Sequence, residues 1–155
     1  MDIVKIFLSH NTKYIDLATY LKNSLHALEI KPSTQLDIKI SEEMAGATDW
    51  RQWIEDNVRS ADIFLLLFPH ASIDMSWCTY ELGRFYDGKR KIVCIKNTDI
   101  PNPPPPFQPY QAYEGDEAGI LKFIHELFVS PGRPFDARSG TPRTGLWCWS
   151  ARFLL

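Results

Sequence analysis

The stretch Ile63–Phe68 reads Ile-Phe-Leu-Leu-Leu-Phe and predicts a strand that is buried on both faces of a sheet. After a short loop, residues 76–81 read Ser-Trp-Cys-Thr-Tyr-Glu. Ser76 can cap a helix at this point, and Glu81 then lies one turn beyond Trp77. A carboxylate beside an indole ring, just past the end of a buried strand, is where an α/β protein places its chemistry.

Strands and helices alternate along the rest of the chain. Apolar or alternating runs predict further strands at 4–8, 35–40, 91–96 and, as a short edge strand, 110–113. Apolar residues at helical spacing predict helices at 12–28, 49–60, 76–87 and 116–128. This order predicts an α/β fold of the flavodoxin-like class: a doubly wound, five-stranded parallel sheet with strand order 2-1-3-4-5 and helices on both faces. A ligand site is expected between the first and third strands, outside their carboxyl ends.

Composition limits the classes of function. The chain has 155 residues, of which 45% are hydrophobic, and this is enough for one domain with its own core. A net charge of -2 provides no basic field, so we expect no direct nucleic-acid binding. No apolar run reaches the length of a membrane span and no secretion signal begins the chain, so no membrane contact is expected. Three widely spaced cysteines predict reduced thiols in a cytoplasmic protein, and four scattered histidines predict no metal site.

Proline dominates residues 97–109, which contain the run Pro103–Pro106. No helix can continue through this run, so we expect polyproline II or an irregular loop, most simply a rigid linker that replaces a helix. The run could also bind a proline-recognition domain. Residues 131–155 match no recognisable pattern. We therefore expect one domain over 1–130, followed by a C-terminal tail over 131–155.

Glu81 and Trp77 each have two interpretations. Glu81 lies beside the helix face that would pack on the sheet, which predicts a position at the edge of the core and not inside it. Spacing alone favours a solvated carboxylate paired with Arg84 or Lys89 over a catalytic one. Taken by itself, Trp77 is more simply explained by packing than by contact with a ligand.

Three polar residues expected near the same place are further candidates. Ser9 can donate to a ligand or cap a helix turn, and His10 can act as a base or be a structural residue at a strand end. Arg51 lies near a helix N-terminus, where it can hold a phosphate or form an ion pair. The loop over 42–47 is either a mobile lid or an ordinary connection. The chain contains no glycine-rich phosphate loop, nucleophile elbow or zinc-protease motif, so these motifs do not decide the function.

Four short boxes in the right order resemble the TIR (Toll/interleukin-1 receptor) domain family. Lys5–His10 resembles the first box of the family, and residues 59–68 resemble its third strand with the lead-in to that strand. Residues 41–48 fall where the family carries its BB loop. Ser76–Leu82 resembles the αC signature, which places a tryptophan four residues before a glutamate. The resemblance covers residues 1–130 and is closest to compact prokaryotic members.

The resemblance implies an NAD⁺ nucleosidase that acts in immune or antiphage defence or in virulence. Glu81 would be the catalytic carboxylate, which stabilises the positive charge that develops on the ribose as nicotinamide leaves. Trp77 and Phe7 would wall the pocket, and the contacts to the rest of NAD⁺ would come from Ser9, His10 and Arg51. NAD⁺ would be a consumed substrate and not a cofactor. The product would be ADP-ribose or a cyclic form of it.

The same family also implies a function without catalysis. Many animal members are adaptors that bind other TIR domains, and family enzymes also work as assemblies. Here the assembly loop would contain Glu43, Met44, Ala45, Gly46 and Ala47. A sensor protein acting in trans would bring copies together. A third interpretation is another flavodoxin-like protein that uses a glutamate near a ribose, such as a nucleoside deoxyribosyltransferase.

Overall fold

A computed structural model describes residues 2–27, 33–41 and 49–129 of the chain. Its centre is one five-stranded sheet in which every neighbouring pair is parallel. The strands are β1 (Asp2–Ser9), β2 (Thr34–Ile40), β3 (Ile63–Phe68), β4 (Lys91–Lys96) and β5 (Gln111–Glu114). Their order is β2-β1-β3-β4-β5, which confirms the flavodoxin-like topology predicted from the sequence.

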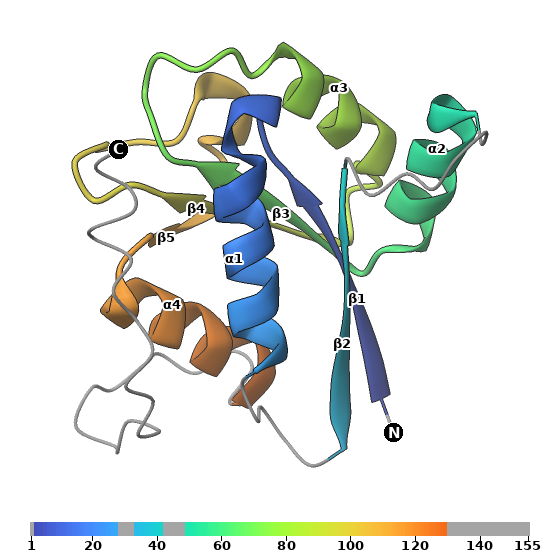
Figure 1. Cartoon of the computed structure of the whole chain (residues 1–155), viewed down its shortest axis with the longest axis horizontal. Helices are drawn as coiled ribbons and strands as arrows, with labels where there is room; N and C mark the ends of the chain where they lie inside the picture. The colour runs from blue at the N-terminus through green and yellow to red at the C-terminus, as the bar shows by residue number, and fades with distance from the viewer. Residues whose placement is uncertain (1, 28–32, 42–48, 130–155) are drawn as a thin grey trace.

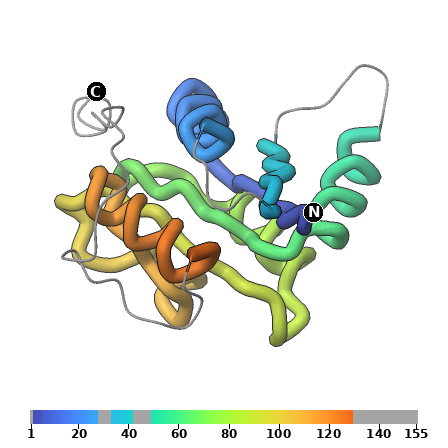
Figure 2. The backbone as a smooth tube through the Cα atoms, turned by 90° about the horizontal axis from the view of Figure 1, so that it is seen from below, coloured from blue at the N-terminus to red at the C-terminus, as the bar shows by residue number. Residues whose placement is uncertain are grey.

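Among the described residues, four α-helices cover the two faces of the sheet, and Figures 1 and 2 show them as layers on opposite sides. They are α1 (Ile15–His26), α2 (Trp50–Ser60), α3 (Ser76–Phe85) and α4 (Glu117–Ile124). One buried cluster joins α1 and α4 to the sheet, and a second joins α2 and α3 to its other face. Helices therefore lie on both faces, as the alternation of strands and helices predicts.

The central strand β3 accounts for both clusters. All six of its residues are buried, and alternate side chains enter the cluster of α1 and α4 or that of α2 and α3. Burial of each large apolar side chain contributes about 1.5–3 kcal/mol of transfer free energy. Because β3 lies between β1 and β4, the residues that follow β1 and β3 meet at the same edge of the sheet.

The ends of the helices follow local capping chemistry. Asn11 accepts a hydrogen bond from the Lys13 backbone N–H and caps a single 3₁₀ turn, Thr12–Tyr14, which leads directly into α1. The predicted helix over 12–28 is thus divided at Ile15, and residue 28 lies outside the described ranges. Asp49 caps α2 in the same way, by accepting from the Arg51 backbone N–H.

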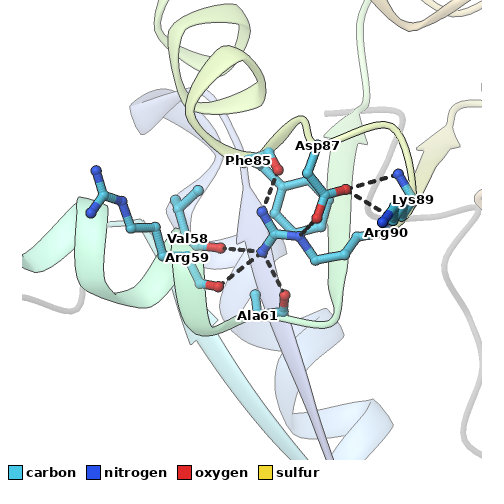
Figure 3. A network of polar contacts seen from close by, with 7 residues as sticks. All are labelled: Val58, Arg59, Ala61, Phe85, Asp87, Lys89 and Arg90. Atoms are coloured by element: carbon cyan, nitrogen blue, oxygen red, sulfur yellow. Dashed lines mark hydrogen bonds and ion pairs between the residues drawn. The ribbon is translucent and has the colours of Figure 1, made fainter.

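Arg90 holds the carboxyl ends of α2 and α3 together (Figure 3). Its guanidinium donates from Nη1 to the backbone carbonyl oxygens of Val58, Arg59 and Ala61, at 3.1, 3.0 and 2.9 Å. The other terminal nitrogen donates to the carbonyl oxygen of Phe85, the last residue of α3. These acceptors include the carbonyls that a helix leaves unpaired at its end, so one cation satisfies two helix termini.

The same guanidinium is fixed on its remaining sides. Nε donates to Asp87 at 2.8 Å, and the guanidinium carbon lies 4.0 Å from the centre of the Phe85 ring. Asp87 also accepts the backbone N–H groups of Lys89 and Arg90 (Figure 3). These bonds from the turn lower the pKa of Asp87, so its carboxylate stays ionised beside Arg90.

The last described part of the chain completes the sheet edge. The predicted edge strand is β5, one residue later than expected, and Asp116 caps α4 by accepting from the Gly119 N–H. A Cβ atom at Gly119 would lie 2.0 Å from the carbonyl oxygen of Glu114, so only glycine allows α4 to approach β5 this closely. One π-helical turn, His125–Val129, follows α4. The expected tail over 131–155 lies outside the described ranges. Among the residues that the structure does describe, no helix is long and apolar enough to span a membrane.

The proline-rich segment adopts no long polyproline II stretch. Pro105–Phe107 forms a single 3₁₀ turn, and Phe107 is fully buried in the cluster beneath α2 and α3. Its ring lies 6.0 Å from that of Phe64 on β3. The segment is therefore an irregular loop that is anchored in the core. An irregular loop was one of the two forms predicted for it, beside polyproline II.

Candidate functional site

The site begins where two loops meet beyond the carboxyl ends of β1 and β3. Asn11, just after β1, donates from its side chain to the backbone carbonyl oxygen of Asp74 at 3.0 Å. Asp74 then accepts the backbone N–H and the hydroxyl of Ser76, at 2.9 and 2.6 Å. The predicted serine cap is therefore wrong: Ser76 is the first helical residue and donates, while Asp74 accepts. Both bonds from Ser76 lower the pKa of Asp74.

Glu81 is fully buried, with 0% of its surface exposed. The hydroxyl of Ser9, the last residue of β1, donates to its carboxylate Oε2. The predicted position at the edge of the core is wrong, because α3 is turned so that Glu81 points at the end of β1. Its expected partner Arg84 instead forms an ion pair with Glu55 of α2, at 3.3 Å.

Cys78 completes a buried cluster of three with Ser9 and Glu81. Its thiol interacts with the Ser9 hydroxyl, which lowers the pKa, but burial dominates and raises the pKa of the thiol to about 12. The charge of Glu81 adds to this rise. At neutral pH Cys78 is therefore a protonated thiol, which is a poor nucleophile.

Phe7 lies on β1, two residues before Ser9, and His10 directly follows that strand. Phe7 is 0% exposed, and its ring lies 5.9 Å from that of Phe64, so it packs beneath the site as part of the core. His10 is also buried, and its Nδ1 lies 2.7 Å from the carbonyl oxygen of Asn11. This bond requires a proton on Nδ1, because a carbonyl oxygen only accepts.

Trp77 lies on the other flank of α3, where it faces solvent. It is 38% exposed, stacks on Tyr80 at 5.2 Å between ring centres, and touches Trp50 of α2 at 5.1 Å. We call Trp50, Trp77 and Tyr80 the aromatic surface. The Arg51 guanidinium lies over Trp50 at 5.2 Å, so the structure joins Arg51 to the aromatic surface and not to the Ser9–Glu81 pair.

A groove of about 510 Å³ opens at the beginning of α3. One wall is the loop after β3 and the first turn of α3, including Asp74, Ser76 and Thr79, and the other is Pro104–Pro106. The proline run thus shapes a surface of the molecule. Glu81 is buried and is not among the residues that line this groove.

Two of these contacts could not be predicted from local sequence patterns. The Ser9–Glu81 bond joins residues 72 positions apart, and no local spacing reveals such a contact. The link from Asn11 to Asp74 spans 63 positions in the same way. The cap of α3 had a local signal, because an aspartate two residues before a serine is typical of an Asx turn.

The family model described as the TIR domain matches residues 6–122, well over half of the chain. The chain belongs to the TIR domain family. No curated protein matches it at a significant level.

The TIR match includes all the elements that build the site. Ser9 at the end of β1 and the signature Trp77 and Glu81 on α3 lie within it. The two signature residues have opposite surroundings, since the carboxylate is buried and the indole is exposed. The expected assembly loop at 43–47 lies inside the match but outside the described residues.

The TIR domain offers acid–base and electrostatic chemistry at this site. Within the described ranges no cluster of three or more histidine, cysteine, aspartate or glutamate residues could hold a metal ion. A carboxylate fixed by a hydroxyl donor can stabilise a positive charge that develops beside it. Its position at the switch point of the sheet matches the place where ligands bind in this class of fold.

Proposed function

We propose that this TIR domain cleaves the nicotinamide–ribose bond of NAD⁺, with Glu81 as the catalytic carboxylate. One observation carries the proposal: the hydroxyl of Ser9 fixes the signature glutamate at the switch point between β1 and β3. An exposed glutamate on a helix surface would need no such partner. The indole of Trp77 begins the same helical turn and is available to an incoming ring.

The chemistry follows from the charge that develops during the reaction. The C–N bond breaks with its electron pair on nicotinamide, which leaves as a neutral base, and the ribose becomes an oxocarbenium-like cation. The Glu81 carboxylate stabilises that cation and hydrogen-bonds the ribose hydroxyls. Water then adds to the cation and loses a proton, giving ADP-ribose. Attack from within the same molecule would give a cyclic product instead.

Full burial of Glu81 has a consequence for this mechanism. A ribose cannot touch a carboxylate that has no exposed surface, so the residues that cover Glu81 must move apart before the reaction. We propose that assembly of several copies, promoted by a sensor protein in trans, favours the open state. Turnover per chain should then rise with protein concentration. Such a role suits defence or virulence signalling in the cytoplasm, where the buried free thiols Cys78 and Cys94 would remain reduced.

Incubation of the full chain with NAD⁺, over a range of protein concentrations, tests the proposal. Glu81→Gln keeps the size of the side chain but removes its charge, and nicotinamide release should fall by about a hundredfold or more. Glu117→Gln, at an exposed glutamate of α4, is the matched control and should keep full activity. Retained activity in Glu81→Gln, with a folded protein, would contradict the assignment of this residue.

A second candidate function is a TIR–TIR interaction module without catalysis. The aromatic surface favours it, because its three large rings are each 38–39% exposed side by side on α2 and α3. Exposed aromatic side chains are enriched at protein interfaces. This function predicts no loss of NAD⁺ at any protein concentration. It also predicts self-association that is sensitive to substitutions at residues 44–47.

A further inference from the structure

The two ends of α3 are held to the rest of the molecule in different ways. At the carboxyl end, the Arg90 guanidinium donates to the carbonyl oxygen of Phe85, packs on its ring at 4.0 Å and also bonds three carbonyls at the end of α2 (Figure 3). At the amino end, the side chain of Asn11 donates to the carbonyl oxygen of Asp74 at 3.0 Å. This neutral hydrogen bond lies at the surface, where water competes for both groups. Of the two attachments, the one at the amino end therefore costs less to break.

The amide of Asn11 bonds a different segment of the chain with each of its two polar atoms. Its Oδ1 accepts the backbone N–H of Lys13 at 3.0 Å and caps the 3₁₀ turn before α1, while its Nδ2 donates to Asp74. The partners determine this orientation, because a backbone N–H only donates and a carbonyl oxygen only accepts. One side chain thus joins the end of β1 to the loop that leads into α3, at the top of Figure 1.

The buried cluster of Ser9, Cys78 and Glu81 lies close in sequence to both partners of this bond. Ser9 precedes Asn11 by two positions, and Cys78 follows Asp74 by four, with Glu81 one helical turn further on. All three residues of the cluster are 0% exposed. Separation of Asp74 from Asn11 would draw the first turns of α3 away from the end of β1. Cys78 and Glu81 would then move away from Ser9 together.

We propose that Asn11 is a positioning residue that keeps Glu81 covered. Its bond to Asp74 closes the site, and breaking that bond uncovers Glu81 and Cys78 at the same time. The amino end of α3 moves, while Arg90 holds the carboxyl end in place. This account of where the site opens does not depend on what the site binds. Its use for the access of NAD⁺ to the carboxylate rests on the proposed function.

Two buried free thiols of the chain can distinguish this local opening from unfolding of the whole domain. Cys78 belongs to the cluster that the proposed motion uncovers. Cys94 is 0% exposed on β4, between β3 and β5, so it is uncovered only when the sheet itself unfolds. Labelling of the folded chain with N-ethylmaleimide, followed by mass spectrometry of its peptides, gives a separate rate for each thiol. The ratio of the two rates reports local opening, and a general loss of stability changes both rates alike.

Two substitutions of Asn11 remove the bond to Asp74 but keep the cap of the turn before α1. Asn11→Asp and Asn11→Ser both retain an oxygen that accepts the Lys13 N–H, and neither has a donor that reaches Asp74. Each should raise the rate of Cys78 labelling by about tenfold relative to that of Cys94. Because Asn11→Ser is neutral, its effect cannot come from a charge added near Asp74.

Asn57→Asp is the matched control. The side chain of Asn57 also donates to a backbone carbonyl oxygen, that of Trp53 at 2.7 Å, but both residues lie on α2, so this bond joins no two segments. The ratio of the two labelling rates should stay as it is in the unaltered chain. Equal acceleration of both thiols by the Asn11 variants, or a ratio that Asn11→Ser leaves unchanged, would overturn the proposal.

Nicotinamide release by the same variants tests the access of NAD⁺ to Glu81. If NAD⁺ binds only the open state, a larger open fraction lowers KM by about the factor seen in labelling and changes kcat less. Release with an unchanged KM would overturn the role of Asn11 in access to the carboxylate. If no variant releases nicotinamide while Cys78 is labelled faster, the proposed function is contradicted and the positioning role of Asn11 is supported.

Discussion

The two flanks of α3 differ sharply although this helix is only ten residues long. One flank buries Cys78 and Glu81 against Ser9 of β1, in a cluster that water does not reach. The other flank presents Trp77 and Tyr80 to solvent beside Trp50 of α2. The family signature contains one residue from each flank, Glu81 from the buried one and Trp77 from the exposed one.

This difference shows that a sequence signature can bring together residues with separate physical roles. A tryptophan and a glutamate four positions apart are usually neighbours on a helix surface. Here a small rotation about the helix axis puts the carboxylate inside and leaves the indole outside. The carboxylate depends on the strand that supplies its donor, whereas the indole depends on the neighbouring helix α2.

The largest effect is expected at Arg90, because it fixes α3 relative to α2 and so determines which flank faces inward. Arg90→Met keeps much of the stem that packs on Phe85 but removes five hydrogen bonds from the guanidinium. Several backbone carbonyls would lose a charged donor. We expect the free energy of unfolding to fall by about 3 kcal/mol, as measured by urea unfolding.

Arg59→Met is the matched control, because this arginine lies in the last turn of α2, one of the two helices that Arg90 joins, and 72% of its side chain is exposed. Its ion pair with Glu55 lies at the surface, where such pairs contribute little. We expect a change of less than about 0.5 kcal/mol in the free energy of unfolding. If both variants lost the same stability, Arg90 would not be the anchor of the two helices.

Local patterns were sufficient to predict the fold. The apolar run of β3, the alternation in β2 and the helical spacing of α1 each identify an element, and their order determines the parallel topology. Chemistry that crosses the fold was not predictable in this way. Nothing in the residues next to Arg90 indicates that its side chain bonds carbonyls about 30 positions earlier.

The sequence predicted that the loops after β1 and β3 meet, but it did not predict the surroundings of Glu81. The segments after β1 and β3 do meet, as the switch-point argument predicts, through Asn11 and Asp74. The burial of Glu81 was missed because helical spacing placed this residue beside the face that packs on the sheet, and so only at the edge of the core. A hydroxyl from a distant strand reverses that expectation, since it provides the partner that a buried carboxylate requires.

A smaller loss of stability is expected when either residue of the Ser9–Glu81 hydrogen bond is replaced. Ser9→Ala leaves the buried carboxylate without the hydroxyl donor, and should reduce the free energy of unfolding by about 1–2 kcal/mol. Glu81→Met removes the acceptor instead. If the bond contributes as the structure indicates, the double variant loses less than the sum of the two single losses, by about 1 kcal/mol.

Chemical unfolding of the four proteins of this cycle measures the coupling. Ser60→Ala provides the control, because Ser60 is exposed at the end of α2 and its hydroxyl bonds a nearby backbone carbonyl. Combined with Glu81→Met, it should show no coupling. Strict additivity of Ser9→Ala and Glu81→Met would instead mean that the two side chains do not interact in solution.

The smallest effect on stability is expected on the exposed flank. Trp77→Ala loses ring contacts with Trp50 and Tyr80, but its indole is already 38% exposed, so the free energy of unfolding should fall by less than about 1 kcal/mol. Tyr86→Ala, at a residue that is 60% exposed just after α3, is the control and should change stability even less. If the proposed function is correct, Trp77→Ala nevertheless lowers nicotinamide release by about tenfold or more, while Tyr86→Ala does not. A loss of several kcal/mol in Trp77→Ala would show that the aromatic surface belongs to the core and that the two flanks of α3 are less distinct than their exposure indicates.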